Sequence, residues 1–156
     1  MDFDTIHSPI GCRLLVAFCD LTNFARLSRD KPSKDIFDIM SRYFELSGDI
    51  VEKAGGKIVK FIGDGILIVF PDHLLIEGVN TLKELQQKVS NLFDRESHDC
   101  LLRVKAHIGS VTCGRIGTRQ DKRFDVFGHH VNQTFLLTGD DFMISKELET
   151  LLPFSI

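Results

Sequence analysis

The chain has 156 residues, enough for one domain with a substantial hydrophobic core but too few for two comfortable domains. Its net charge is −3, from 19 basic and 22 acidic residues, and the two signs are mixed along the chain, so nothing predicts binding to nucleic acid. No apolar run approaches the length of a membrane span, and the N-terminal segment MDFDTIHSPIG lacks the apolar block of a signal peptide. We therefore expect a cytoplasmic domain with no membrane segment in this chain.

Strand-like and helix-like periodicities alternate along the chain. Short apolar runs such as RLLVAFCD indicate strands, whereas apolar residues spaced three or four apart indicate helices. The longest helical pattern stops at Gly55-Gly56, where a helix end is expected. In chain order, the predicted elements are a strand at 13–20, a short helix at 22–30, a long helix at 33–54, strands at 57–62 and 66–70, a helix at 72–92, a strand at 101–108, a charged hairpin at 110–122, a strand at 123–127, a helix at 130–138, and a short strand and helix within 144–154.

This order of elements predicts an α+β fold. It is typical of a ferredoxin-like mixed or antiparallel sheet with helices packed on one side. A doubly wound parallel sheet would need a helix between every two strands, which the hairpin around Gly63-Asp64-Gly65 excludes. We expect a single domain that covers residues 1–156.

The Gly-Asp-Gly in KFIGDGILIVF interrupts a nearly continuous apolar run with a carboxylate. Taken alone, this tripeptide is more often a tight turn than a functional site. A second acid, Asp20, ends the first predicted strand just before a helix start. If the hairpin pairs with that strand, Asp20 and Asp64 meet at one edge of the sheet and form a hard oxygen site suited to Mg²⁺.

The residues after Asp20 add a possible phosphate site. The backbone N–H groups of Thr22, Asn23 and Phe24 lie at the start of the predicted short helix, where they could bind phosphate oxygens. Two metal-binding carboxylates beside such a helix start would bind a metal–nucleoside triphosphate.

Three blocks of the sequence carry a family resemblance. AFCDLTNFARLS, GGKIVKFIGDGILIVF and LRVKAHIGSVTCGRIGTRQDKRFDVFGHHVN resemble the class III adenylyl/guanylyl cyclase catalytic domain in order and spacing, and the similarity covers roughly residues 11 to 155. The resemblance implies a head-to-tail homodimer. Each active site would take its metal carboxylates from one protomer and its base-reading residues from the other.

By position, the resemblance makes Asp20 and Asp64 the ligands of two Mg²⁺ or Mn²⁺ ions, which would activate the ribose 3′-hydroxyl and neutralise the triphosphate. It makes Lys60 and Asp125 the residues that read the purine. An ammonium donates to N1 of adenine and a carboxylate accepts from its exocyclic amine, whereas guanine reverses both polarities. Asn132 matches the asparagine that orients the ribose, and ATP is the implied substrate.

Two departures from the family pattern divide the functional hypotheses. Leu136 stands where active members carry an arginine that stabilises charge on the α-phosphate, one helical turn after Asn132. Members of the family also carry a phosphate-binding lysine on a strand near the C-terminus. We expect this sequence to lack that strand and its lysine, and Lys146 comes too early to replace it. One hypothesis is a metal-dependent adenylate cyclase with reduced turnover, which makes cyclic AMP and pyrophosphate. The alternative is an impaired cyclase-like module for nucleotide binding, dimerisation or regulation. A diguanylate cyclase is not favoured, because its GG[D/E]EF hairpin is absent.

The histidines and cysteines receive structural interpretations. His129 and His130 are interpreted as solvent-facing residues at a helix start, and His107 is assigned a packing or hydrogen-bonding role. The four cysteines stand apart without a C-x-x-C pair, so reduced thiols are expected, and neither a zinc site nor a disulfide framework is indicated.

Overall fold

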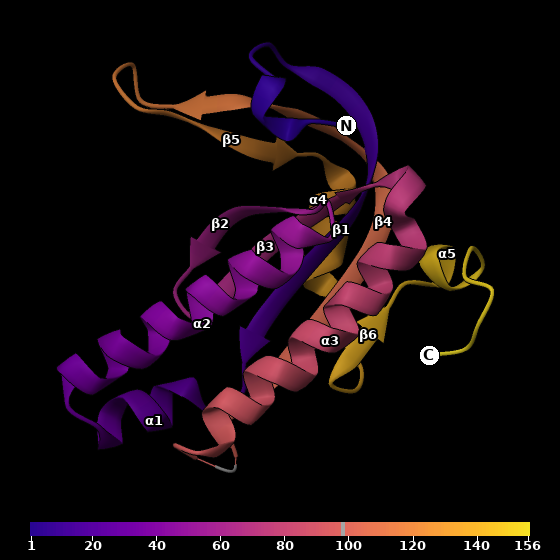
Figure 1. Ribbon diagram of the computed structural model, residues 1–156. Helices are drawn as coiled ribbons and strands as arrows, with labels where there is room; N and C mark the ends of the chain where they lie inside the picture. Colours follow the sequence, from indigo (N-terminus) through magenta and orange to yellow (C-terminus); the bar gives the residue numbers. More distant parts are fainter. Residues whose placement is uncertain (98) are drawn as a thin grey trace.

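The computed structural model describes residues 1–97 and 99–156, and its centre is one six-stranded sheet (Figure 1). Five strands are antiparallel in the order β2-β3-β1-β4-β5, and β6 pairs in parallel with β4. The predicted α+β class with a mixed sheet is therefore confirmed. The strands are β1 (Ile10–Leu21), β2 (Lys57–Ile62), β3 (Gly65–Pro71), β4 (Leu102–Gly117), β5 (Lys122–Phe127) and β6 (Phe142–Ile144).

The helices lie close to their predicted positions. They are α1 (Phe24–Asp30), α2 (Ser33–Lys53), α3 (Leu75–Asp94), α4 (His129–Leu136) and α5 (Lys146–Glu149), with short 3₁₀ turns η1 (Phe3–Thr5) and η2 (Asp72–Leu74). Within the described residues, no helix is both long and apolar enough to cross a membrane.

One strand is much longer than predicted. β4 continues through Gly117 instead of ending near residue 108, because β1 pairs with it from Leu21↔Leu102 to Ile10↔Cys113. Beyond that pairing, β4 pairs with β5, so the predicted charged hairpin consists of two strands joined at residues 118–121. This hairpin extends beyond the helices in Figure 1.

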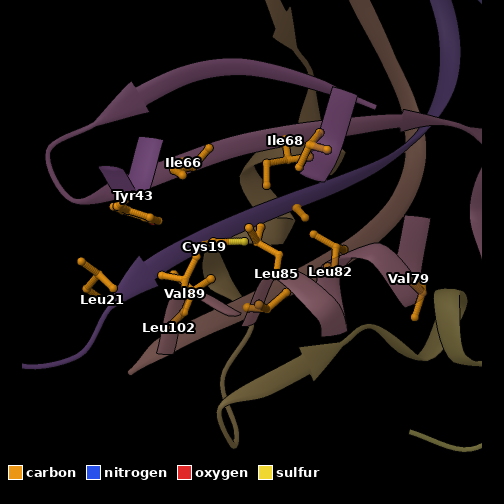
Figure 2. Packing of buried hydrophobic residues seen from close by; sticks show 14 of the residues in the cluster. Cys19, Leu21, Tyr43, Ile66, Ile68, Val79, Leu82, Leu85, Val89 and Leu102 are labelled. Carbon is orange, nitrogen blue, oxygen red and sulfur yellow. The ribbon is translucent and has the colours of Figure 1, made fainter. Parts of the chain in front are cut away.

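The larger core lies between the sheet and the pair α2 and α3 (Figure 2). Helix α2 buries Ile39, Tyr43 and Val51 at the three-to-four spacing of one helix face. They pack in one cluster with residues of the sheet such as Cys19 and Ile68. Each fully buried aliphatic side chain contributes about 1.5–3 kcal/mol to folding, so this layer holds the strands in register.

The other face of the sheet is also covered. A second apolar cluster joins Val16 and Val69 of the sheet to Phe3 of η1 and Val131 of α4. The expectation that all helices lie on one side was therefore wrong. The cause is alternation along the strands: successive β1 residues point to opposite faces, and Leu14 to Ala17 are all fully buried, so both faces need a cover.

Candidate functional site

Asp20 and Asp64 lie at the same end of the sheet. β1 pairs with β3, which is the condition on which the metal-site hypothesis depended, and the register Cys19↔Ile66 brings the end of β1 beside the Gly63-Asp64 turn. The Leu21 backbone N–H donates to Asp64 Oδ2 at 2.9 Å. The Asp64 carboxylate is thus fixed beside the residue that follows Asp20.

Asp64 lies in a two-residue hairpin turn. Ile62 pairs with Gly65, which leaves Gly63 and Asp64 as the two central residues, and Gly63 has a φ of +61°, as the first central position of a type II′ turn requires. The Tyr43 hydroxyl donates to the backbone oxygen of Asp64 at 3.1 Å. Burial raises the pKa of Tyr43 well above its usual range, so the hydroxyl keeps its proton and remains a donor.

Arg103 is the residue that sequence reasoning missed. It lies opposite Asp20 in β4 and donates from Nε to Oδ1 at 3.2 Å and from a terminal nitrogen to Oδ2 at 2.8 Å. Such a forked pair orients a carboxylate more strongly than a single bond. The register between β1 and β4 would have revealed the pairing of Arg103 with Asp20, but the sequence does not indicate that register.

The oxygen donors at this edge fit a hard divalent cation. Two carboxylates are what Mg²⁺ uses when substrate phosphates supply further ligands. The fork from Arg103 occupies one position on each Asp20 oxygen, whereas a carboxylate offers about four lone-pair positions, so Asp20 retains acceptor capacity. In the described part of the chain, no group of three or more His, Cys, Asp or Glu residues forms a self-sufficient metal cage.

The predicted phosphate amides are not all available. The Thr22 N–H donates to Leu101 O at 2.8 Å, so this amide already has a partner in the structure. The Thr22 hydroxyl and the Asn23 side-chain amide both donate to Asp99 O at 2.9 Å, which ties this segment to the start of β4. Asn23 adopts a left-handed φ of 55° at the start of α1, and the amides of Asn23 and Phe24 remain candidates.

Lys60 and Asp125 form the second part of the candidate site. Lys60 Nζ donates to Asp125 Oδ2 at 2.8 Å, although β2 and β5 are opposite ends of the antiparallel strand order. Sheet twist brings these distant strands together, and the Val126 N–H fixes the other Asp125 oxygen at 2.8 Å. The pair lines an open cavity of about 830 Å³ between α2, β2 and the β4–β5 hairpin, which we call the groove. Phe44, Phe61 and Ile116 also line it.

Helix α4 presents Asn132 and Leu136 to solvent. They lie one turn apart, and Leu136 is 77% exposed. Lys105 of β4 anchors this helix by donating from Nζ to Phe135 O at 2.9 Å. The side chain at position 136 is therefore held at a defined place without being part of the core.

The histidines form a network under α4. His107 Nε2 lies 2.8 Å from His130 Nδ1, so the interpretation of His130 as a solvent-facing residue was wrong. His107 Nδ1 lies 2.7 Å from Ser145 Oγ, which confirms the hydrogen-bonding role expected for His107. Burial, followed by the nearby His130, lowers the pKa of His107. A Cβ at Gly109 would overlap the His130 ring, so the glycine permits this close approach.

The candidate residues therefore fall into two groups within one chain. Asp20 and Asp64 lie at the turn beside α1, whereas Lys60 and Asp125 lie in the groove under the hairpin. No hydrogen bond or ion pair connects the two groups among the residues that the structure describes.

Comparisons with known proteins agree with this architecture. The sequence profile of the adenylate and guanylate cyclase catalytic domain matches residues 12–143. A protein of Streptomyces coelicolor named adenylate cyclase is 31% identical over 127 residues, which are 81% of this chain and 30% of that protein. One of Anabaena cylindrica with the same name is 27% identical over 135 residues, or 81% of this chain and 27% of that protein.

The structural comparison extends over most of the chain. The crystal structure of the adenylyl cyclase CyaB from P. aeruginosa has a TM-score of 0.83 and 21% sequence identity, with 92% of this chain and 82% of that chain covered. The chain spans less than a third of the length of the two curated relatives. On the extent of the profile match, the chain belongs to the adenylate and guanylate cyclase catalytic domain family.

Proposed function

We propose that this chain is a metal-dependent adenylate cyclase that converts ATP to 3′,5′-cyclic AMP and pyrophosphate. The observation that carries the proposal is the Lys60–Asp125 pair, a donor and an acceptor fixed 2.8 Å apart on the wall of a large cavity. Membership of the family supports nucleotide cyclisation as the reaction class.

The Lys60–Asp125 pair supports adenine as the base. An ammonium has three donors and a carboxylate about four acceptor positions, so their mutual bond leaves both able to contact a ligand. Lys60 would donate to N1 of adenine, and Asp125 would accept from its exocyclic amine. Lys60 Nζ also lies 5.5 Å from the centre of the Phe127 ring, which restricts where the ammonium can point.

Asp20 and Asp64 are the residues that would hold the divalent ions. When bound there, Mg²⁺ or Mn²⁺ would supply positive charge to lower the pKa of the ribose 3′-hydroxyl and to neutralise the triphosphate. The Leu21 amide and the Arg103 fork would keep both carboxylates oriented before substrate arrives. Asn132, exposed on α4, would orient the ribose.

The active species would be a homodimer with shared sites. The family resemblance places the two groups in different protomers, so a second copy would bring Asp20 and Asp64 of one protomer to Lys60, Asp125 and Asn132 of the other. Large apolar side chains around the groove support this arrangement, since Phe61, Ile116 and Phe127 are 45%, 52% and 54% exposed.

A cyclase assay over a range of protein concentrations tests this proposal. We expect the purified chain to form cyclic AMP from ATP, but little cyclic GMP from GTP, with Mn²⁺ or Mg²⁺ and none with a chelator present. Specific activity should rise with protein concentration as dimers form. A rate that does not depend on concentration, from a species that sediments as a monomer, would contradict the shared-site arrangement.

A second candidate function rests on Leu136. The family resemblance places an arginine at this position, and a leucine offers no positive charge for the α-phosphate. The chain would then bind nucleotide as a regulatory or dimerisation module. Tight binding of Mn²⁺–ATP without cyclic AMP at any protein concentration would favour this function over catalysis.

A further inference from the structure

Cys12 and Cys113 bring two sulfur atoms into contact on the face of the sheet opposite α2 and α3. Cys12 lies on β1 opposite Val111 of β4, so Cys113, two residues further along β4, points to the same face. The two Sγ atoms are 3.0 Å apart. Both side chains pack with the second apolar cluster, where Cys113 is fully buried and Cys12 is half-buried.

We propose that Cys12 and Cys113 are a redox modification site, which hydrogen peroxide converts to a reversible disulfide at the base of the β4–β5 hairpin. The thiols are reduced in this structure. The separation of the sulfur atoms is about 1 Å longer than the roughly 2.03–2.05 Å of a disulfide bond, so only a small closure is required.

The different environments of the two sulfurs assign their roles. Burial, and then the hydrogen bond to Cys12, raises the pKa of Cys113 to about 12, so this thiol keeps its proton. Cys12 is the more accessible sulfur and therefore the one that meets peroxide. Because the thiols already touch, Cys113 is in place as the resolving residue.

The chemistry balances with peroxide as the oxidant. The Cys12 thiolate attacks one peroxide oxygen, the O–O bond breaks, and the departing hydroxide takes the proton released by Cys12 to form water. The Cys113 sulfur then attacks the sulfenic sulfur of Cys12, the S–O bond breaks, and the second hydroxide leaves with the proton of Cys113. Two thiols are oxidised to one disulfide and peroxide is reduced to two water molecules. A dithiol reductant returns the two electrons.

The strand geometry couples the disulfide to the relative position of β1 and β4. Cys12 and Cys113 are offset by two residues, and such diagonal neighbours are further apart than the directly opposite pairs of a sheet. A relaxed disulfide needs Cβ atoms about 3.5–4.5 Å apart, so closing the remaining distance of about 1 Å between the sulfur atoms would draw β1 and β4 slightly together.

The closure would reach the candidate nucleotide site through the hairpin. Cys113 pairs with Val126 of β5, and the next residue of β4, Gly114, pairs with Asp125. A shift of β4 at Cys113 would therefore alter the position of Asp125 relative to Lys60. This consequence, unlike the disulfide itself, rests on the proposed function.

Thiol counting and mass measurement test the modification directly. After exposure of the reduced chain to hydrogen peroxide, we expect two of the four thiols to disappear, with a mass lower by two hydrogen atoms and a peptide that links Cys12 to Cys113. Dithiothreitol should restore both thiols. Cys12→Ser should abolish the link, and Cys113→Ala should leave Cys12 to accumulate oxygen adducts. Cys100→Ala is the matched control, because Cys100 is also buried but packs in the other apolar cluster, so the link should still form.

Loss of all four thiols together, or oxidation of Cys12 to sulfinic acid in the wild-type chain without any linked peptide, would overturn the proposal. Neither readout depends on nucleotide binding, so failure of the cyclase proposal would leave this result intact. The consequence at Asp125 is measured separately as the affinity for Mn²⁺–ATP, which should fall severalfold on oxidation in wild type and not in Cys12→Ser. An unchanged affinity for Mn²⁺–ATP in the disulfide-linked protein would contradict the proposed effect on Asp125, whereas the proposal of a disulfide between Cys12 and Cys113 would still hold.

Discussion

The turn around Asp64 and the groove around Asp125 both hold a carboxylate with a positive or polar partner, but one depends on neighbouring strands and the other on strands far apart in the sheet order. At the turn, Asp20 and Asp64 are held by Arg103 and the Leu21 amide, and all four residues lie in or directly before the adjacent strands β3, β1 and β4. In the groove, Lys60 and Asp125 come from strands at opposite ends of the antiparallel order. The turn is therefore fixed by strand register, whereas the groove depends on where the hairpin lies.

This difference predicts separable effects. Changes at the turn should alter metal-dependent binding, and changes in the groove should alter base recognition. The following variants are arranged from the largest expected effect to the smallest.

Asp64→Ala should have the largest effect. Loss of a direct carboxylate ligand should reduce the affinity for Mn²⁺–ATP by more than about 100-fold, because even partners of metal ligands contribute about 10–100-fold. Asp20→Ala should act in the same way. Calorimetric titration measures both affinities, with Asp30→Ala as the control, because Asp30 is an exposed acid at the end of α1 that pairs with Arg29. Unchanged affinity in both site variants would reduce Gly63-Asp64-Gly65 to a simple turn.

Leu136→Arg should raise the rate of ATP cyclisation. A guanidinium at this position would project from the same exposed face as Asn132 and would stabilise charge mainly in the transition state, so kcat should rise more than ATP affinity. By analogy with arginine fingers, the gain could reach about 10³-fold. Because Leu136 is 77% exposed, the free energy of unfolding should change by no more than about 0.5 kcal/mol.

Leu136→Gln is the matched control for that variant, since it is polar but carries no charge. Steady-state kinetics of the two variants and wild type make the comparison. A soluble, dimeric Leu136→Arg protein that binds Mn²⁺–ATP but makes no more cyclic AMP than wild type would count against the enzyme proposal and favour the binding module.

Lys60→Met should weaken recognition of adenine without affecting the metal. Loss of one charge-assisted hydrogen bond typically costs about 1.5–3 kcal/mol, which corresponds to a rise in KM for ATP of about 10–150-fold. Binding of Mn²⁺–triphosphate without a base should be unchanged. Lys57→Met is the control from the same strand, because Lys57 pairs with the exposed Asp4 at 2.7 Å outside the groove. Equal losses in both variants would show that β2, and not the base contact, is disturbed.

The histidine network should produce a smaller, pH-dependent effect. Burial lowers the pKa of His107 below its ordinary value of 6.5, an effect that His130 and His129 reinforce and Glu147 opposes. The unfolded chain therefore binds a proton at a higher pH than the folded chain does. The contribution of His107 to the free energy of unfolding is fully present above pH 6.5. It is lost as the pH falls through the lower folded pKa, with a slope of up to about 1.4 kcal/mol per pH unit.

Urea unfolding at a series of pH values measures this slope. His107→Asn should flatten the acid side of the profile, and the exposed His73→Asn should leave it as in wild type. An equally steep acid loss in His107→Asn would assign the effect to other groups.

The local elements of the fold were predictable because they depend on short-range patterns. The spacing of Ile39, Tyr43 and Val51 on α2 and the turn chemistry of Gly63-Asp64-Gly65 are both local, and the structure contains the helix and the hairpin that they predict. The candidate site residues were found through motif order and spacing, which the family match places within residues 12–143.

The sequence alone determined that this is a mixed α+β domain with acids at the ends of strands, since apolar periodicity and turn residues are properties of neighbouring positions. Only the tertiary structure decided the partners of those acids: Arg103 for Asp20, the Leu21 amide for Asp64 and the contact between opposite edges at Lys60–Asp125. It also decided that Thr22 N–H is occupied, that His130 meets His107, and that Cys12 meets Cys113. These contacts join residues up to 101 positions apart, and they depend on register and sheet twist, which no local pattern encodes.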